Sequence, residues 1–319
     1  MKAAVVAARG KAPVYGDFAD PVPAEGERLI SVTAAALSPV TRSRAAGAHY
    51  SSSADFPFVA GVDGVGRLHD GRRAYFLMPR APFGGMAEKA VAPEARCVAM
   101  PDDLDDIAAA AIANPGWSSL AALKERAKLK PGETVLVNGA TGAAGRLAVQ
   151  IARHLGASRV VATGRNLAAL KAVRALGADA TVHLVEDNES LEDAFRSQFA
   201  AGIDIVLDYL WGPSAERLLA GAAKAGRGPV RVRFVQIGSM SGANITLSSD
   251  VLRSSAIEIL GSGFGSIPLN GFVRAIRELL WAAAPAGFKI ETRSVPLSEV
   301  EQAWSRDAGP ARTVFKIGE

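Results

Sequence analysis

Cysteine is almost missing from the sequence, because Cys97 is the only one among the 319 residues. An intramolecular disulfide is therefore impossible, and zinc sites that need four cysteines or a Cys-x-x-Cys pair are excluded. The chain also lacks an uninterrupted apolar run of the roughly 18 residues that a membrane-spanning helix requires. Its first ten residues, MKAAVVAARG, hold too few apolar residues for a signal-peptide core. We expect a soluble protein of the cytoplasm.

Runs of charge of one sign are also absent from the sequence. The 36 Lys and Arg residues exceed the 32 acidic residues by a small margin, and they are spread along the chain. This distribution argues against a nucleic-acid partner, and attraction to an anionic small molecule explains the same surplus. The composition, 49% hydrophobic and 21% charged, is typical of globular proteins, and the length allows two domains.

The pattern of the sequence changes near residue 113. Residues 1–112 are β-rich, with short β-prone runs between Gly, Pro and Asp residues. From 113 a helix at 118–129 is followed by regular alternation of strands and helices, which predicts a parallel α/β sheet with helices on both faces. The first part is predicted to hold strands at 3–7, 29–34, 58–68, 74–78 and 87–91. The second is predicted to hold strands at 134–138, 158–163, 181–184, 202–210, 232–238 and 257–264, helices at 142–155, 166–176, 190–199, 214–225 and 271–284, and a final strand at 312–317.

A glycine-rich turn, NGATGAAG, directly follows the apolar strand TVLVN and precedes a helical pattern. This context is typical of a dinucleotide-binding turn, in which a pyrophosphate approaches the backbone N–H groups at the start of a helix. A Cβ at Gly142 would block that approach, and Gly145 lets the helix lie close to the sheet. The alternative is a tight strand–helix turn that needs glycine for geometry alone. The candidate cofactor-binding residues here are Gly139, Thr141, Gly142, Ala143, Ala144 and Gly145.

The residues after the next strand bear on the choice of dinucleotide. An acidic residue about 20 positions past the glycines is typical of NAD-binding sites, but this sequence has Gly164 and then Arg165. A carboxylate would repel a 2′-phosphate, whereas glycine leaves room for it and Arg165 can bind it with a planar guanidinium. We therefore predict NADPH rather than NADH. The alternative is that Arg165 is an ordinary solvated charge, and Lys171 and His183 are weaker candidates for the same phosphate.

Several further motifs, in order, carry a resemblance to a known family. FPFVAGVDGVG, GGMAEKAVAP and PDDLDDIAAAAIANPGWSSLAAL stand upstream of VLVNGATGAAGRLAVQIARHLGA. Together they resemble the medium-chain dehydrogenase/reductase superfamily and, within it, the zinc-independent quinone oxidoreductase group. The resemblance implies a GroES-like β-rich catalytic domain from residues 1–112 and 286–319, and a Rossmann domain, a doubly wound parallel sheet that binds NADPH, from 113–285. It also implies a homodimer.

The positions of the zinc ligands in related alcohol dehydrogenases hold other residues here. Thr41 stands at the cysteine position, and Gly61, Val62 and Asp63 stand where that group has Gly-His-Glu. Without such ligands a catalytic zinc site is not expected, and Cys97 is read as a buried thiol. Reduction of an electron-poor acceptor, a quinone or an α,β-unsaturated carbonyl, does not need the metal. The leading hypothesis is therefore an NADPH-dependent reductase of such acceptors. The alternatives are an enoyl or alkenal reductase of one pathway and a low-turnover NADPH-binding sensor.

The resemblance also supplies candidates around the reacting atoms. Tyr50 matches a position that faces the substrate and could bond the acceptor oxygen or donate a proton; alternatively it is a half-buried aromatic that closes a loop. Ser118 corresponds to a hydroxyl near the nicotinamide, or else caps the following helix. Ser38 and Thr41 stand where many relatives have Asn and Asp, which weakens any transfer of polar substrate contacts. The remaining cofactor-binding candidates are Gly238, Ser239, Gly263 and Phe264, of which Phe264 is equally compatible with simple packing.

Overall fold

The computed structural model describes residues 1–319 except 53–54, 186, 227, 307–310 and 319. It divides the chain into two compact units, Met1–Asn114 with Ile276–Glu319, and Pro115–Ala275. The expected mixed α/β class is confirmed, because one unit contains a parallel sheet and the other is rich in antiparallel strands. In the described part of the chain, no helix has the length and apolar character needed to cross a bilayer.

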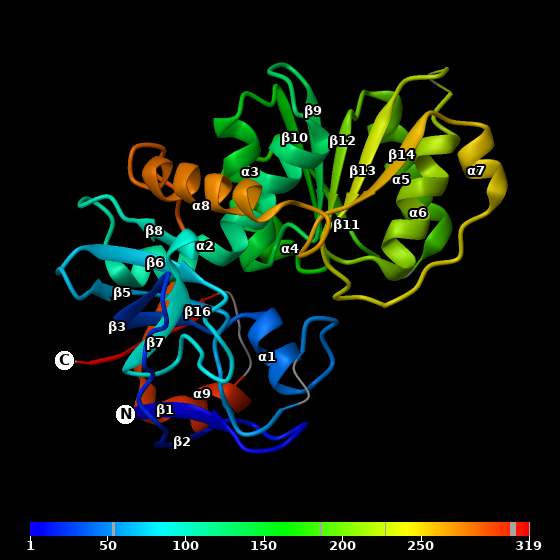
Figure 1. Ribbon diagram of the computed structural model, residues 1–319. Helices are drawn as coiled ribbons and strands as arrows, with labels where there is room; N and C mark the ends of the chain where they lie inside the picture. The colour runs from blue at the N-terminus through cyan, green and yellow to red at the C-terminus, as the bar shows by residue number, and fades with distance from the viewer. Residues whose placement is uncertain (53–54, 186, 227, 307–310, 319) are drawn as a thin grey trace. The chain divides into compact units, whose positions relative to one another are not determined.

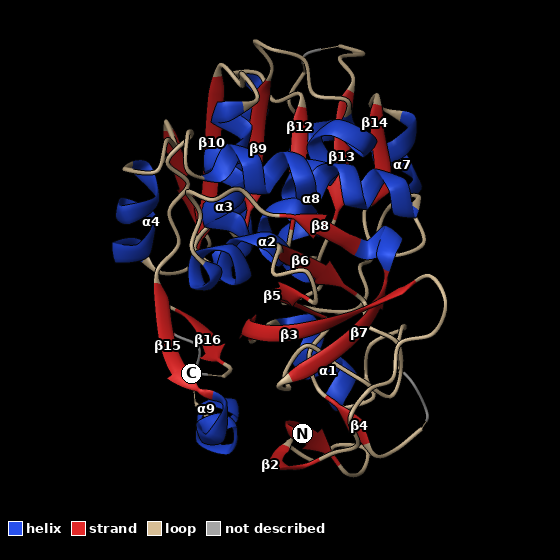
Figure 2. Cartoon of the chain, turned by 60° about the vertical axis from the view of Figure 1, so that its left-hand side comes forward, coloured by secondary structure: helices blue, strands red, loops and turns tan. Residues whose placement is uncertain are grey.

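The first unit is organised around the long strand β3, Glu27–Ala36. This strand pairs with β5, β7 and β16, and Figure 2 shows β3 and β7 side by side. Its sheet runs in the order β15-β16-β3-β5-β6-β8, and a smaller sheet runs β2-β1-β4. The other elements of this part are β1 Lys2–Val6, β2 Val14–Asp17, α1 Pro39–Ala45, β4 Phe58–Val59, β5 Asp63–Leu68, β6 Arg73–Leu77, β7 Lys89–Pro93, η1 Glu94–Arg96, β8 Cys97–Ala99, β15 Thr292–Pro296, η3 Leu297–Glu299, α9 Val300–Ser305 and β16 Arg312–Lys316.

The run 58–68, which the sequence predicts as one strand, is two strands in the structure. Gly61 separates β4 from β5 with a φ of 105°, a conformation that residues with a side chain rarely adopt. A Cβ at Gly61 would also lie 2.7 Å from the backbone nitrogen of Met86. The turn therefore depends on glycine both for its dihedral angle and for the close approach of the neighbouring backbone.

Helix α2 begins at Asp106 and ends at Ala121, so the prediction that a helix begins at residue 118 is wrong. Asp105 marks its start, where Oδ1 accepts a hydrogen bond of 2.9 Å from the Ala108 nitrogen. Pro115 lies inside the helix, although an internal proline costs about 3 kcal/mol. Burial of the preceding alanines offsets that cost, which sequence propensity does not show. A π-helical turn, η2 Ala122–Ala127, continues the helix.

Among the described residues of the second unit, the strands form one six-stranded parallel sheet in the order β11-β10-β9-β12-β13-β14. Taken in chain order this is 3-2-1-4-5-6, the order of a doubly wound dinucleotide-binding sheet, and Figure 1 shows these strands side by side. The elements are β9 Thr134–Asn138, α3 Ala143–His154, β10 Arg159–Gly164, α4 Leu167–Arg174, β11 Ala180–His183, α5 Asn188–Ala200, β12 Ile205–Asp208, α6 Gly212–Ala223, β13 Val232–Gln236, α7 Ser249–Arg253 and β14 Ile257–Gly261. Helix α8, Leu269–Ala283, belongs to this unit up to Ala275 and to the first unit from Ile276.

The helices of this unit lie on both faces of the sheet. One core cluster joins Leu136 and Val206 of the sheet to Phe195 of α5 and Leu218 of α6. Helices α3 and α4 pack against β9 and β10, and right-handed crossovers on the other side of the strand-order reversal put them on the opposite face. This arrangement leaves the carboxyl ends of β9 and β12 adjacent, at the point where such sheets bind ligands.

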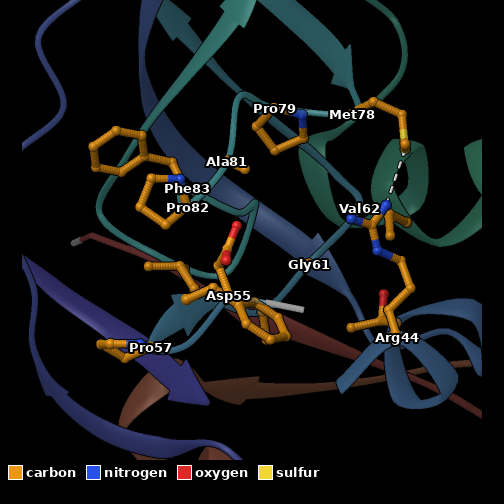
Figure 3. Close-up of a pocket in the computed structure, with 14 residues that line it drawn as sticks. Arg44, Asp55, Pro57, Gly61, Val62, Met78, Pro79, Ala81, Pro82 and Phe83 are labelled. Carbon is orange, nitrogen blue, oxygen red and sulfur yellow. Dashed lines mark hydrogen bonds between the residues drawn. The ribbon is translucent and has the colours of Figure 1, made fainter. Parts of the chain in front are cut away.

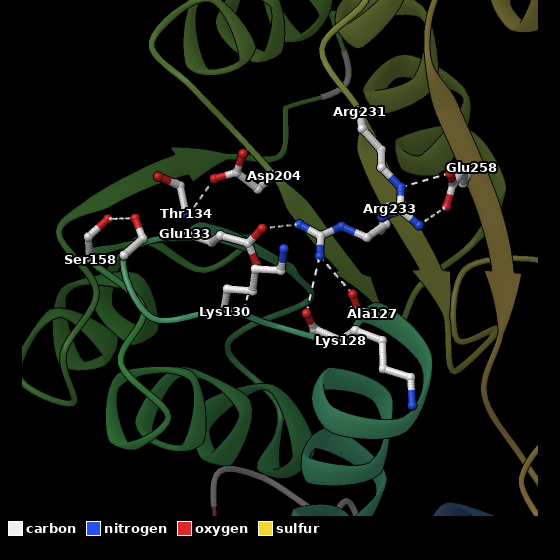
Figure 4. A network of polar contacts seen from close by, with 11 residues as sticks. Ala127, Lys128, Lys130, Glu133, Thr134, Ser158, Asp204, Arg231, Arg233 and Glu258 are labelled. Carbon is white, nitrogen blue, oxygen red and sulfur yellow. Dashed lines mark hydrogen bonds and ion pairs between the residues drawn. The ribbon is translucent and has the colours of Figure 1, made fainter.

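A buried arginine fixes the amino-terminal edge of the same sheet, as Figure 4 shows. Arg233 of β13 is 4% exposed. Its Nη2 lies 2.6 Å from Oε1 of Glu133, and its Nη1 donates to the Ala127 carbonyl oxygen at 2.7 Å. At this edge Asp204 Oδ2 also accepts a hydrogen bond from the Thr134 nitrogen at 2.8 Å. These bonds hold the end of the π-helical turn against the sheet, away from its carboxyl edge.

Candidate functional site

The glycine turn joins the carboxyl end of β9 to α3, beside the point where the strand order reverses. Gly139 has a φ of 89°, in the region that favours glycine. A Cβ at Gly145 would lie 2.3 Å from the Gly139 carbonyl oxygen and 2.5 Å from the Cα of Ala140. The absence of that Cβ is therefore what allows α3 to start in contact with the turn, as the sequence predicts.

Gly142 has a different environment from the other two glycines. It is the N-cap residue of α3, and no side chain caps the helix. A Cβ at Gly142 would meet nothing nearer than the Gly139 carbonyl oxygen at 4.0 Å, so no described protein atom fills that space. The first N–H groups of a helix, here at Ala143, Ala144 and Gly145, have no partner within the helix. Next to Thr141, the turn thus offers an open approach and donors to an anion, which suits a dinucleotide pyrophosphate.

A buried polar network supports the turn from below, and the sequence analysis missed it. It consists of three side chains that are 0% exposed and come from adjacent strands: Thr163 of β10, Asn138 of β9 and Asp208 of β12. Thr163 Oγ1 donates to Asn138 Oδ1 at 2.7 Å and accepts from the Gly139 nitrogen at 3.0 Å. Asn138 Nδ2 donates to Asp208 Oδ1 at 2.8 Å. The available signal was a polar residue near the carboxyl end of each of three apolar strands.

Asp208 also fixes the loop that follows β12. Its Oδ1 accepts from the Leu210 nitrogen at 3.0 Å, and its two oxygens accept from the Trp211 nitrogen at 3.1 and 3.2 Å. Burial raises the pKa of Asp208, while these hydrogen bonds act to lower it. Trp211 is held at a φ of 57°, an uncommon conformation for a bulky residue. The carboxylate therefore stabilises both the glycine turn and a strained loop beside it.

Gly164 packs closely against the glycine turn. A Cβ at Gly164 would lie 2.4 Å from Cγ2 of Thr141, so the missing side chain makes room for this threonine of the glycine turn. Gly164 thus has a packing role, and its contact with a 2′-phosphate stays a prediction. Arg165 is exposed, and its guanidinium makes no hydrogen bond or ion pair within the described ranges. Its carbonyl oxygen lies 2.8 Å from Nε2 of His183, and Lys171 is exposed on α4.

A hydrogen bond holds Ser118 in place, and ring packing holds Phe264. Ser118 lies inside α2, where its Oγ donates to the Pro115 carbonyl oxygen at 2.9 Å, so the alternative that it caps a following helix is wrong. The Phe264 ring lies 5.6 Å from the ring of Trp117 and 5.6 Å from that of Phe272. This aromatic cluster supports a packing role for Phe264 and leaves its cofactor contact a prediction.

The remaining cofactor candidates follow the last two strands of the parallel sheet. A Cβ at Gly238, just beyond β13, would lie 2.7 Å from the Tyr209 carbonyl oxygen, and Ser239 is exposed. The Gly263 nitrogen, beyond β14, donates to Ser266 Oγ at 2.8 Å. These residues lie past the carboxyl ends of the strands, and a contact with a cofactor stays a prediction for each.

The residues at the zinc-ligand positions make contacts of other kinds. Thr41 Oγ1 lies 2.8 Å from Oγ of Ser38, whose oxygen also accepts from the Thr41 nitrogen as the N-cap of α1. Burial raises the pKa of the Cys97 thiol to about 11, so its thiolate form is disfavoured. Across the part of the chain that the structure describes, no three His, Cys, Asp or Glu side chains gather in a metal-binding group. The protein residues here do not form a zinc-ligand set.

Asp63 begins β5 and is 2% exposed. Its Oδ2 accepts a hydrogen bond of 2.7 Å from the hydroxyl of Tyr75 on β6. Burial raises the pKa of Asp63 to about 6, although the Tyr75 hydrogen bond and the positive charge of buried Arg312 act to lower it. Asp63 is therefore a buried structural carboxyl group.

We expect Asp63 to make the protein less stable as the pH rises from about 4 to 7. The pKa of about 6 in the fold exceeds the ordinary value of 3.8, so the folded state retains a proton that the unfolded chain loses in this range. The stabilisation is complete below the ordinary pKa and is lost as the pH passes the folded one. The unfolding free energy of the wild type minus that of Asp63→Asn should fall by on the order of 2–3 kcal/mol across this range. Urea titrations at several pH values measure this difference, and a constant difference would contradict the assignment.

Tyr50 lies in an exposed turn after α1, with 72% of its surface accessible, so the alternative of a half-buried aromatic is wrong. Its ring stacks on His49, with the ring centroids 4.2 Å apart. Burial and the charge of Arg44 both lower the pKa of His49, which places the stacked pair within reach of the Arg44 charge. Tyr50 is accessible to a ligand, and its catalytic role stays a prediction.

A cavity of about 340 Å³ lies within the first unit, and Arg44 is part of its wall. Gly61 is also in the wall, with Thr41 and Val62, which the resemblance places at zinc-ligand positions. The cavity is of the size that binds small molecules. Most of its other lining residues are apolar or proline: Pro57, Phe58, Val59, Ala60, Met78, Pro79, Ala81, Pro82 and Phe83, together with Asp55 (Figure 3).

Comparison with known proteins gives matches over nearly the whole chain. A family model described as "Zinc-binding dehydrogenase" matches residues 143–281. "Probable NADPH-dependent quinone reductase tdiC" of Emericella nidulans is 30% identical, with 95% of this chain and 96% of that protein covered. A "2-methylene-furan-3-one reductase" of Solanum lycopersicum is 31% identical over 54% of this chain and 48% of its own length. The crystal structure of the quinone oxidoreductase from Thermus thermophilus, also solved with NADPH, superposes with a TM-score of 0.82 at 28% identity, covering 99% of this chain and 100% of that one.

Proposed function

From the premise that this chain belongs to the quinone oxidoreductase-like group of the medium-chain dehydrogenase/reductase superfamily, we propose that it reduces a quinone or an α,β-unsaturated carbonyl compound without zinc. It is an NADPH-dependent oxidoreductase of that group. The observation that carries the proposal is the glycine turn, where an open approach at Gly142 meets the amino terminus of α3 at the strand-order reversal. The relatives named as quinone reductases support the choice of acceptor.

The described residues account for how a dinucleotide would be held. The backbone N–H groups at the start of α3 bind the pyrophosphate, and the Asn138–Thr163–Asp208 network keeps the turn in place. Arg165, exposed and without a partner for its guanidinium in the described chain, binds the 2′-phosphate. NADPH, when bound, supplies the hydride. Tyr50 and solvent are the proposed sources of the proton that the reduced acceptor takes up.

The nature of the acceptor follows from the side chains that replace zinc ligands. Thr41 and Val62 do not provide the sulfur and nitrogen ligands with which zinc polarises a carbonyl group. An acceptor that is already electron-poor needs less polarisation, and quinones and enones have this property. The relative from Solanum lycopersicum, named as a reductase of a methylene-furanone, supports an enone as the second candidate acceptor.

Acceptor-dependent oxidation of NADPH tests the proposed function directly. Purified protein is mixed with NADPH and, in turn, menadione, methyl vinyl ketone or a simple aldehyde, and the nicotinamide absorbance is followed. We expect turnover with the first two acceptors and none with the aldehyde, both before and after dialysis against EDTA. Tight binding of NADPH without turnover on any acceptor would instead identify a low-turnover sensor, and activity abolished by EDTA would contradict the zinc-free proposal.

Arg165→Ala should weaken NADPH binding much more than NADH binding. Loss of a charged hydrogen bond to the 2′-phosphate costs about 1.5–3 kcal/mol, whereas NADH has no phosphate there. Isothermal titration of both cofactors with both proteins gives the comparison. Arg174→Ala, a change of an exposed cation on α4 that is not a candidate for this phosphate, serves as the matched control. An equal loss of affinity for the two cofactors would show that Arg165 does not select NADPH.

A further inference from the structure

Among the described residues that line the first-unit cavity, Arg44 is the one cation, and most of the others are apolar. Arg44 comes from the last turn of α1, and burial lowers the pKa of its guanidinium. Its Nη1 donates to Sδ of Met78 at 3.5 Å, shown as a dashed line in Figure 3. A thioether is a weak acceptor, whereas a guanidinium has five N–H donors. In the described chain no carboxylate or carbonyl oxygen accepts a hydrogen bond from Arg44, so most of its donors are left for a ligand.

Two hydrogen bonds fix the backbone of Met78, the residue that Arg44 contacts. Its nitrogen donates to the Val62 carbonyl oxygen at 2.7 Å, and its carbonyl oxygen accepts from Nη1 of Arg96 at 2.9 Å. Its φ is 50°, a left-handed conformation that is uncommon for a residue with a side chain. Such strained residues cluster at ligand sites, where neighbouring contacts hold them in place. The wall next to Arg44 is therefore held in one arrangement.

Asp55 is the one carboxylate among the described residues that line the cavity. Among the described residues Asp55 forms no ion pair with Arg44, whose Nη1 donates to Met78 Sδ instead. A ligand with one negative charge would therefore place it at Arg44 and its apolar part against the proline and aliphatic wall. The same carboxylate would repel a second negative charge. The cavity thus suits a monoanion with an apolar body.

We propose that Arg44 binds a carboxylate of the acceptor, so that the preferred substrates are quinones or enones that carry a single carboxylate group. This inference rests on the proposed function and names the substrate class for it. The cavity volume of about 340 Å³ lies at the small end of ligand pockets and limits the acceptor to a compact molecule. A planar guanidinium forms paired hydrogen bonds with the two charged oxygens of a carboxylate. A neutral ester of similar shape lacks this charged pair of oxygens.

The kinetic test compares acetylacrylate with its methyl ester, two enones that differ in charge. The ratio of kcat/KM for the acid to kcat/KM for the ester should fall by about 10–100-fold in Arg44→Met. Arg44→Lys should restore it only in part, because lysine keeps the charge but cannot form the paired hydrogen bonds. Arg42→Met is the matched control, because Arg42 lies on the same helix but its Nη2 donates to the Arg306 carbonyl oxygen and it does not line the cavity. A ratio that does not change in Arg44→Met would overturn the proposal.

A binding test without NADPH separates this inference from the proposed function. Titration of the protein with naphthoate and naphthamide should show tighter binding of the anion, with the preference lost in Arg44→Met and kept in Arg42→Met. If no acceptor supports NADPH oxidation, the proposed function fails, and this titration still decides whether Arg44 binds an anion. Equal affinity of the wild type for naphthoate and naphthamide would exclude the anion site even in an active enzyme.

Discussion

Gly145→Ala should lower the free energy of unfolding by about 3 kcal/mol, whereas Gly142→Ala should leave it almost unchanged and weaken NADPH binding by at least about tenfold. The two glycines lie in the same turn but have different surroundings. A Cβ at position 145 would lie 2.3 Å from a backbone oxygen, and only movement of α3 or the turn relieves that overlap. A Cβ at position 142 has no protein atom nearer than 4.0 Å, so it takes only space that a pyrophosphate would use.

Urea unfolding and titration with NADPH, done on both variants, measure these two effects separately. The result expected for Gly142→Ala is a folded, stable protein with poor cofactor affinity. If Gly142→Ala binds NADPH as the wild type does, the pyrophosphate does not approach the turn at this residue. If Gly145→Ala is as stable as the wild type, the contact between α3 and the turn is looser than the geometry indicates.

Asp208→Ala should destabilise the protein by about 3–4 kcal/mol and also reduce NADPH affinity. The substitution removes the acceptor for Asn138 Nδ2 and for the Leu210 and Trp211 nitrogens, and it leaves these donors without that partner in a buried site. Asn138 is bonded to Thr163, which in turn accepts from the Gly139 nitrogen. The loss at Asp208 therefore reaches the glycine turn through two hydrogen bonds.

Asp204→Ala provides a control on the segment that precedes the same strand. Asp204 accepts a hydrogen bond from the Thr134 nitrogen at the opposite edge of the sheet, away from the glycine turn. Its removal should reduce stability without changing NADPH affinity in the folded protein. Cofactor affinity is measured by titration below the unfolding transition of each variant. Unchanged NADPH affinity in Asp208→Ala would mean that the network supports stability only.

The second half of the chain was the easier one to predict from sequence. Apolar runs such as 134–138 and helices closed by glycine lie in a regular order, and each predicted strand or helix of the parallel sheet has a counterpart in the structure. The first half was harder, because its strands pair over long distances in the sequence. Helix α1 and the start of α2 were missed. Pro115 lies inside α2, where buried alanines pack around a proline that intrinsic propensity disfavours.

The candidate site divides in the same way. The glycine turn and the exposed Arg165 could be named from spacing, because local backbone geometry and the chemistry of phosphate binding require particular residues there. The roles of Gly164 and Asp63 could not, because their neighbours Thr141 and Tyr75 come from other strands or turns. Arg44 was overlooked, since an arginine in a short helix gives no sign that its guanidinium lines a cavity.

The sequence by itself determined that the chain has a dinucleotide turn after an apolar strand and that zinc ligands are replaced by threonine and valine. The first feature depends on residue type and short spacing, which a sequence displays directly, and the second on the resemblance to the family. Only the tertiary structure decided that Asn138, Thr163 and Asp208 form one network beneath the turn. It also decided that the Arg44 guanidinium lines a cavity and donates to the sulfur atom of Met78. The physical reason is that burial and hydrogen-bond partners are set by strands and helices that meet only when the chain is folded.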